Sequence, residues 1–203
     1  MTIEKLIELK SKSYKVKILN YILVLAVFAS CSEPPVPKPK GYFRIEIPEQ
    51  AFDYVEVDCG LSFEKSKYSK LEKVESESSG HACWFNLYYP RYNARLHCTS
   101  LELRDNLMTL MNDAQEMVFS HDKKSNGISR IRVSNKEKHL NGVLYHIGGP
   151  VATPMQFFVT DSTEHFLRGS LYFEHAPNAD STAPVVNALL ADVERLMKSA
   201  TWE

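Results

Sequence analysis

Apolar residues recur at two different spacings along this 203-residue chain, and each spacing predicts a different kind of element. Strand-like segments, several of which alternate apolar and polar positions, occur in HACWFNLYYP, YNARLHCTS, ISRIRVSNKEKHL, VLYHIGG, TPMQFFVT and FLRGSLYF. Apolar positions at steps of three and four, typical of amphipathic helices, occur over residues 104–120 and near the end of the chain. Strands joined by short turns between two such helices predict an α+β fold, in which amphipathic helices cover an antiparallel sheet.

Turn-forming residues separate these strands. The dipeptide Asn141-Gly142 readily adopts the two positive φ angles of a type I′ turn, so we expect a tight hairpin at that position. Asp161 and Ser162 begin the DSTEH connection, where their side chains can bond to the local backbone. These turns set the register of the strands on either side.

The segment DSTAPVVNALLADVERLMKSATWE predicts the last helix. Ser181 or Thr182 is expected as its N-cap, with Pro184 in the first turn. Trp202 follows the helix and is expected to dock on the sheet. The predicted buried stripes of the two helices comprise Leu107, Leu110, Met111, Ala114, Met117 and Val118 in the first, and Val186, Leu189, Leu190, Val193, Leu196 and Met197 in the second.

The first thirty residues have the pattern of an export signal. A lysine-rich lead precedes an apolar run over residues 18–29, which is shorter than the ~20 residues that a membrane-spanning helix needs. The run ends in small residues followed by Cys31, which resembles the lipobox of bacterial lipoproteins, although Phe28 stands where that pattern usually has leucine. We therefore expect residues 1–30 to be a lipoprotein signal peptide and Cys31 to carry the lipid; a plain secreted protein or an uncleaved anchor is the alternative.

The residues after this cysteine indicate a tethered domain. Four prolines in SEPPVPKPKGY favour an extended spacer over residues 31–41. The remaining residues, 42–203, are enough for one globular domain with a hydrophobic core. Several acyl chains together exceed what stable anchoring requires. We expect a membrane-anchored lipoprotein facing the periplasm, on the inner or the outer membrane.

Charge argues against one class of partner. The chain carries 24 basic and 25 acidic side chains, and loss of the signal peptide would remove five lysines but only two glutamates. The mature protein is therefore acidic and has no basic stripe to neutralise phosphates, so nucleic-acid binding is not predicted.

Three cysteines remain for structural use: Cys59, Cys83 and Cys98. An oxidising compartment allows one bridge among them. A hairpin around Pro90-Arg91 would place Cys83 opposite Cys98, whereas a bridge between Cys59 and Cys83 would close a longer loop. The residues alone leave both pairings open, together with three unpaired thiols.

Motifs that carry chemistry are absent from the sequence. It contains no Walker loop, G-x-G-x-x-G, H-E-x-x-H or G-x-S-x-G pattern, and its seven histidines lack zinc-site spacing, so we expect no catalytic residues, cofactor or metal. Ser162 or Ser170 with His165 would be the residues of a hydrolase, the least favoured alternative. The aromatic-rich WFNLYYPRY and QFFV could line a binding face, although strand propensity explains most of them.

Four segments resemble the GldD family of gliding-motility lipoproteins of Bacteroidetes: PKPKGYFRIEIPE, CWFNLYYPRYNARLH, QFFVTDSTEHFLRGSLYFEHAPNADSTAPV and the terminal TW. The most specific part is VTDSTEHFLRGSLYF. The resemblance implies a non-enzymatic component of the gliding machinery, linked to type IX protein secretion, with other gliding and secretion proteins as partners. The order of elements also resembles the PsbP or Mog1 type of α/β/α sandwich, a likeness of fold that carries no function.

The resemblance also bears on individual residues. Cys98 falls where relatives are expected to have an aliphatic residue, which implies that Cys59 pairs with Cys83. Gly169, in mid-strand, indicates close approach of another group. The candidate structural or contact motif comprises Gln156, Thr160, Asp161, Ser162, Phe166, Gly169 and Tyr172. The alternative function is a periplasmic lipoprotein that binds a small ligand or a peptide, with the ligand itself unknown.

Overall fold

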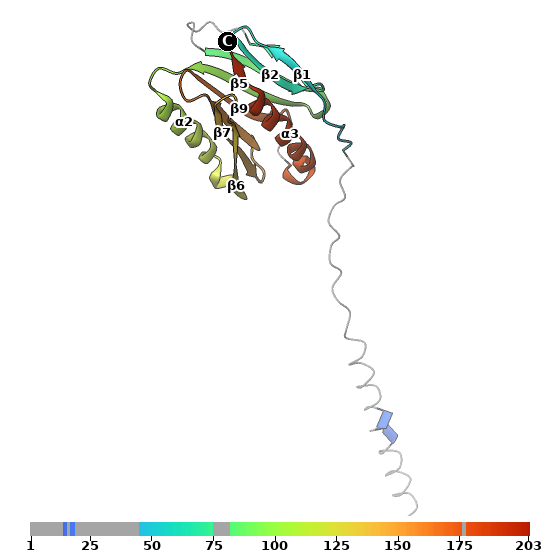
Figure 1. Cartoon of the computed structure of the whole chain (residues 1–203). Helices are drawn as coiled ribbons and strands as arrows, with labels where there is room; N and C mark the ends of the chain where they lie inside the picture. Colours follow the sequence, from blue (N-terminus) through green and yellow to red (C-terminus); the bar gives the residue numbers. More distant parts are fainter. Residues whose placement is uncertain (1–13, 16, 19–44, 75–81, 176–177) are drawn as a thin grey trace, which may run out of the picture. The chain divides into compact units, whose positions relative to one another are not determined.

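The computed structural model describes residues 14–15, 17–18, 45–74, 82–175 and 178–203 (Figure 1). The predicted signal peptide, Cys31 and the spacer lie almost entirely outside these residues, so their roles stay predictions. Among the described helices, none combines the length and the apolar character needed to cross a bilayer. The elements below belong to one compact unit, Phe43–Glu203.

The six segments form six strands of a large antiparallel sheet, and residues 70–73 add a seventh that the sequence did not predict. Its strand order is β3-β4-β5-β9-β8-β7-β6, and every neighbouring pair is antiparallel. The strands are β3 (Lys70–Lys73), β4 (Ala82–Tyr89), β5 (Ala94–Glu102), β6 (Gly127–Asn135), β7 (Leu140–Gly148), β8 (Met155–Thr160) and β9 (His165–Phe173).

A second, three-stranded sheet has the order β1-β2-β10. It consists of β1 (Phe52–Glu56), β2 (Leu61–Ser66) and the short terminal β10 (Thr201–Trp202). The helices are α2 (Leu107–Phe119) and α3 (Ala179–Ser199), with two 3₁₀ turns, η1 (Pro90–Tyr92) and η2 (Asp122–Lys124). The predicted α+β class, an antiparallel sheet covered by amphipathic helices, is confirmed.

One face of the large sheet carries the main core. Both α3 and the small sheet pack on this face and bury their apolar side chains against the large sheet. Phe63 of β2 stacks on Phe85 of β4 with ring centroids 5.3 Å apart, and Leu189 and Val193 of α3 are buried in the same cluster. Burial of a large apolar side chain stabilises the fold by about 1.5–3 kcal/mol.

On the opposite face, α2 covers only part of the sheet. It contacts β8 and β9, and Ala114 and Val118 are buried beneath it in a second cluster with Phe158 and Phe166. Met117, expected in the core, is instead 43 % exposed at the margin of this helix. The strands beyond that margin are not covered by α2, and this uncovered area contains the candidate site.

The predicted turn at Asn141-Gly142 is wrong. The hairpin exists, but it turns through residues 136–139, and Asn141 and Gly142 lie inside β7. A Cβ on Gly142 would lie 2.2 Å from the Phe158 carbonyl oxygen and 2.9 Å from the Met197 methyl carbon. The glycine therefore serves close packing of β7 against its neighbours rather than a turn.

The β4–β5 hairpin has a different register from the one expected. Cys83 pairs with Ser100 and Phe85 pairs with Cys98, because η1 and Asn93, which has a φ of 47°, lengthen the connection. The expected faces are unchanged, since the shift is by two residues, which is one full period of a strand.

The start of the last helix also differs from the prediction. Asn178 is the N-cap of α3, and its side chain accepts a hydrogen bond from the Ser181 N–H. Ser181 and Thr182 instead donate their hydroxyls to the Asn178 carbonyl oxygen, at 3.1 and 2.8 Å. Because the helix starts earlier, Pro184 lies within it rather than in its first turn.

Candidate functional site

Polar and aromatic residues line up across the part of the large sheet that α2 leaves uncovered. The register places Asn86, His97, Ser170 and Gln156 side by side on β4, β5, β9 and β8. A neighbouring row runs through Tyr88, Arg95 and Tyr172. We call this area, together with Trp84, the open face.

Ion pairs hold one end of the open face in place. Arg95 donates to Glu72 of β3 at 2.8 and 3.2 Å, pairs with Glu174, and lies over the Tyr88 ring at 4.4 Å. The Arg95 hydrogen bond lowers the pKa of Glu72. These bonds tie β3, β5 and the end of β9 together, which orders the side chains of the face.

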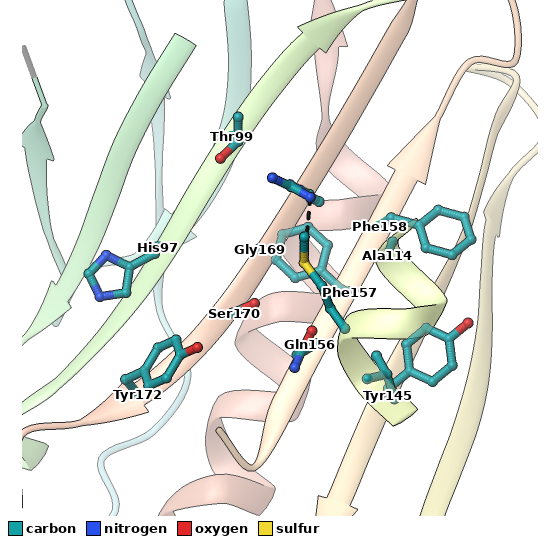
Figure 2. Close-up of a pocket in the computed structure, with 13 residues that line it drawn as sticks. His97, Thr99, Ala114, Tyr145, Gln156, Phe157, Phe158, Gly169, Ser170 and Tyr172 are labelled. Carbon is teal, nitrogen blue, oxygen red and sulfur yellow. Dashed lines mark hydrogen bonds between the residues drawn. The ribbon is translucent and has the colours of Figure 1, made fainter. Parts of the chain in front are cut away.

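Between the open face and α2 lies a cavity of about 200 Å³ (Figure 2). Three strands and α2 supply most of its lining. The lining residues are His97, Thr99, Ala114, Met117, Val118, Tyr145, Gln156, Phe157, Phe158, Arg168, Gly169, Ser170 and Tyr172. The volume corresponds to about seven water molecules at ~30 Å³ each, so the space can hold a small ligand.

Gln156 is the most unusual side chain of this lining. It is 6 % exposed, and no hydrogen bond joins its amide to any described residue. Since no described side-chain N or O atom is both fully enclosed and unpartnered, the amide must reach the cavity space. The amide can therefore exchange hydrogen bonds with water or with a ligand in the cavity.

The hydroxyls of Ser170 and Tyr172 face the same space (Figure 2). The His97 ring packs edge-on against Tyr172, with centroids 5.6 Å apart, and His97 Nδ1 lies 2.8 Å from Asn86 Oδ1. Burial, followed by the charge of Arg95, lowers the pKa of His97. The imidazole is therefore held in one orientation and favours its neutral form.

In the turn between β8 and β9, the Asp161 side chain bonds to the local backbone as predicted, whereas Ser162 takes part through its backbone N–H. Asp161 Oδ1 accepts hydrogen bonds from the N–H groups of Thr163, Glu164 and His165, at 2.9–3.0 Å. Asp161 Oδ2 lies 2.8 Å from His165 Nδ1. Burial alone would raise the pKa of Asp161, but these donors outweigh it and lower the pKa to about 2. Ser162, with a φ of 70°, donates its N–H to Thr160 Oγ1.

His165 connects this turn to the end of the chain. Its ring stacks on Trp202, with centroids 5.1 Å apart and planes at 9°. Trp202 Nε1 donates to Ser100 Oγ of β5 at 3.1 Å. The predicted docking of Trp202 on the sheet is confirmed, and the Asp161 turn supports it.

Gly169 marks a close approach on the core side of β9. A Cβ at this position would lie 2.3 Å from Phe157 Cε1 and 3.2 Å from Cys98 Sγ. The ring of Phe157 occupies the space that a side chain would take. The expected close approach at this glycine is confirmed.

The predicted motif is therefore divided among three surroundings. Gln156 and Tyr172 line the cavity with Gly169. Phe166 stacks on Phe158 within the α2 cluster, with centroids 5.4 Å apart. Thr160, Asp161 and Ser162 shape the β8–β9 turn.

Several lining residues lay outside the predicted motif, among them His97, Thr99 and Arg168. Their alternating polar positions on β5 and β9 give a sequence signal for an exposed face. That signal does not place them beside Gln156, because their proximity depends on the pairing of strands.

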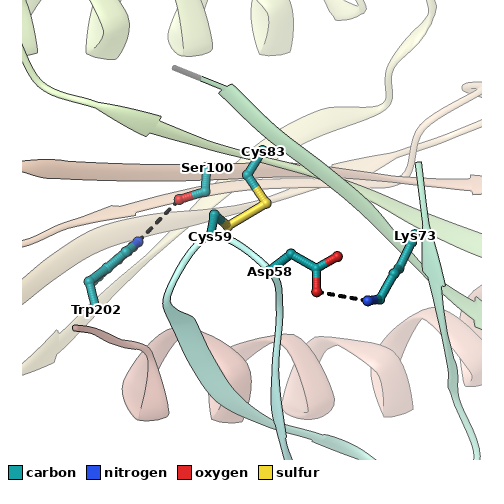
Figure 3. Close-up of a disulfide and its surroundings, with 6 residues drawn as sticks. All are labelled: Asp58, Cys59, Lys73, Cys83, Ser100 and Trp202. Carbon is teal, nitrogen blue, oxygen red and sulfur yellow. Dashed lines mark hydrogen bonds and ion pairs between the residues drawn. A yellow bond between two sulfur atoms is a disulfide. The ribbon is translucent and has the colours of Figure 1, made fainter. Parts of the chain in front are cut away.

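The structure contains a disulfide between Cys59 and Cys83, the pairing implied by the family resemblance (Figure 3). It joins the loop before β2 to β4, with Cα atoms 6.1 Å apart. An ion pair between Asp58 and Lys73, at 2.7 Å, lies beside it. Cys98 is a buried free thiol, and its burial raises its pKa. The disulfide thus fastens the small sheet to the large one.

The groups of the hydrolase alternative are only partly brought together. His165 and Ser170 are an odd number of residues apart on β9, so their side chains point to opposite faces of the sheet. The His165 ring is engaged by Asp161 and Trp202. Within the described residues, no three His, Cys, Asp or Glu side chains are grouped closely enough to hold a metal.

Comparison with known families connects this architecture to a process. The family described as "Gliding motility lipoprotein GldD" matches residues 32–202, which is most of the chain. The chain belongs to the GldD family. Membership of this lipoprotein family implies anchoring to a membrane. The family resemblance drawn from the sequence is thereby confirmed.

Other comparisons add little about this GldD family member. No curated protein matches the chain. A similar solved structure is the solution structure of cyanobacterial PsbP (CyanoP) from Synechocystis. It is 12 % identical, the match covers 83 % of this chain and 100 % of that chain, and the TM-score is 0.44. Likeness at this level carries nothing about function.

Proposed function

We propose that this gliding motility lipoprotein is a non-enzymatic component of the gliding machinery that acts by contact with other gliding and secretion proteins. Its lipid anchor would hold the folded domain at the membrane, facing the periplasm. The proposed link to type IX protein secretion comes from the family resemblance. The single observation that supports a contact role is the open face.

The composition of the open face suits a protein partner. It presents Trp84, Tyr88 and Tyr172 together with Arg95, and these residue types are enriched at protein interfaces and at their energetic hot spots. Trp84 is 36 % exposed, so part of its ring is available to a partner. The ion pairs of Arg95 order the face before any partner arrives, which reduces the entropy lost on binding.

The surroundings of His165 favour a non-enzymatic role. The ring supports the Asp161 turn and the docking of Trp202, and both contacts have a plain structural purpose. Residues that serve packing in this way need no substrate. We therefore infer that this part of the motif acts through folding stability.

A substitution at Trp84 tests the contact role without touching the cavity. Trp84→Glu places a charge on the open face, and Tyr68→Glu is the matched control, because Tyr68 is 44 % exposed in the turn after β2. Colony spreading and cell-surface secretion would be measured at equal protein abundance. We expect Trp84→Glu to impair both and Tyr68→Glu to leave them unchanged. Normal gliding of the Trp84 variant would refute contact through this face.

A further inference from the structure

The cavity beside α2 shares Tyr172 with the open face, but Trp84 and Tyr88 do not line it. Its lining includes an amide, three hydroxyl side chains besides Tyr145, and the guanidinium of Arg168, but no carboxylate. We propose that this cavity is a binding site for a small organic acid, a molecule with one carboxylate and a short apolar body.

The polar side of the cavity can hold the carboxylate. Gln156 is almost fully buried and has no partner among the described residues, so its NH₂ group is available to donate. The Ser170 hydroxyl lies in the same row, directly across the strand pair from Gln156. Arg168 makes a weak contact from Nη1 to Met117 Sδ at 3.5 Å, which leaves its other N–H groups to meet an anion.

The helix side of the cavity can hold the apolar body. Met117 and Val118 of α2 line the cavity together with Phe158. Methionine adapts its shape to varied ligands, and Met117 is 43 % exposed. A volume of about 200 Å³ has room for a short-chain acid of roughly six to ten non-hydrogen atoms.

The positive charge of the cavity lining determines whether an anionic, neutral or cationic ligand is favoured. With Arg168 and no acidic residue present, a cation would be repelled and would find no counter-ion. His97, whose Nδ1 is held by Asn86, adds a neutral hydrogen-bonding edge. A carboxylate is therefore favoured over an uncharged amide of the same shape, and both are favoured over an amine.

The three glutamines of the chain supply a direct assay. Gln50 and Gln115 are exposed, so their side-chain amides serve as internal controls for Gln156. The full-length protein, in detergent micelles with glutamine labelled by ¹⁵N, would be titrated with butyrate, butyramide and butylammonium. We expect butyrate to shift the Gln156 side-chain resonances most, butyramide less and butylammonium not at all, with no shift of the two controls.

Variants then assign the groups that hold the carboxylate. Arg168→Gln and Gln156→Leu should each weaken butyrate binding about ten-fold or more. Arg132→Gln removes the same charge from the exposed side of β6 and should leave the affinity unchanged. Thermal melting of each variant separates a loss of binding from a loss of folding. If one of Arg168→Gln and Gln156→Leu unfolds, the butyrate affinity of the other still tests the proposal.

Three results would overturn the proposal. The first is the absence of any Gln156 shift with butyrate, and the second is equal shifts with all three probes, which would mean non-specific filling. The third is binding of an acetylated tetrapeptide with a free carboxyl end but not of butyrate, which would make the carboxylate part of a protein chain. Trp84 does not line the cavity, so the two proposals are tested independently. Absence of butyrate binding would not contradict protein contact through the open face, and normal gliding of the Trp84→Glu variant would not contradict ligand binding in the cavity.

Discussion

At Gly169, the absence of a side chain makes room for the Phe157 ring on the neighbouring strand. The ring is 2 % exposed, so it cannot swing away into solvent if a methyl group is added. The next contact, Cys98 Sγ, lies 3.2 Å from the position of a Cβ, which closes the other side. Because Gly169 has no Cβ, the side chains of β5 and β8 can pack directly against the backbone of β9 at this position.

Two glycines allow a matched test of this packing. Gly169→Ala should lower the free energy of unfolding by about 1–3 kcal/mol, because the added methyl overpacks the core. Gly148→Ala should be neutral or slightly stabilising, since its Cβ would meet only the Gly127 carbonyl oxygen at an ordinary 3.6 Å. Urea unfolding at constant pH measures both. Gly169→Val should cost more than Gly169→Ala.

A double variant identifies the clashing group. If the Phe157 ring causes the loss, Gly169→Ala combined with Phe157→Leu should be less destabilised than the sum of the two single variants. Strict additivity would mean that the cost arises elsewhere.

At the scale of elements, the β8–β9 connection shows how a turn positions two strands. Asp161 satisfies three successive backbone donors with one oxygen, and Thr160 Oγ1 donates to the His165 carbonyl oxygen at 2.6 Å. These bonds fix the register in which Gln156 pairs with Ser170. The cavity therefore depends on a turn at the far end of its strands.

The low pKa of Asp161 predicts a specific dependence of stability on pH. Its folded pKa, about 2, lies below the ordinary value of 3.8, so its contribution is present above pH ~4 and is lost as the pH falls toward 2. The shift corresponds to about 2 kcal/mol. Between pH 4 and 2, the free energy of unfolding of Asp161→Asn should therefore fall by about 2 kcal/mol less than that of the wild type, as measured by chemical denaturation.

Asp122 provides the control for this measurement. It lies exposed in η2, away from the β8–β9 turn, so Asp122→Asn should keep the pH profile of the wild type. If Asp161→Asn and Asp122→Asn gave the same profile, the hydrogen bonds of the turn would not be the cause.

At the scale of the whole molecule, the predicted spacer would join the folded domain to its lipid anchor. The family implies anchoring, and the described residues form the domain that the anchor would hold. Within that domain, the disulfide, the Asp58–Lys73 ion pair and Trp202 fasten the small sheet to the large one. The open face and the cavity are on the other side of the large sheet from this attachment.

Acylation of Cys31 is the prediction that belongs to this scale. Cys31→Ser removes the thiol that would carry the lipid, so cells fed an alkyne-tagged fatty acid should no longer label the protein, and the domain should leave the membrane fraction. Cys98→Ala, which alters a cysteine inside the domain, should keep the label. Labelling and membrane retention of Cys31→Ser would contradict the lipoprotein prediction for this residue.

The sequence by itself determined the features that depend on neighbours along the chain. Periods of two and of three to four residues predicted the strands from β4 to β9 and both helices, because one side of each element must face the core, whereas β1, β2, β3 and β10 were not predicted. The Asp161 turn was predictable for the same reason, since its donors lie within four residues of the acceptor. The family could also be inferred from the sequence, because its motifs are continuous segments.

Tertiary structure decided the features that join distant segments. The dipeptide Asn141-Gly142 predicted a turn, but Gly142 lies within β7, where the Phe158 carbonyl oxygen and Met197 leave no room for a side chain. Cys83 could meet Cys98 on local grounds, but the longer η1 connection placed it opposite Ser100, and the loop before β2 brought Cys59 to it. The cavity around Gln156 is built by strands and a helix whose order in space differs from their order in sequence. The local sequence pattern does not predict which residues line this cavity, because strand pairing and helix packing are set by the burial of the whole core.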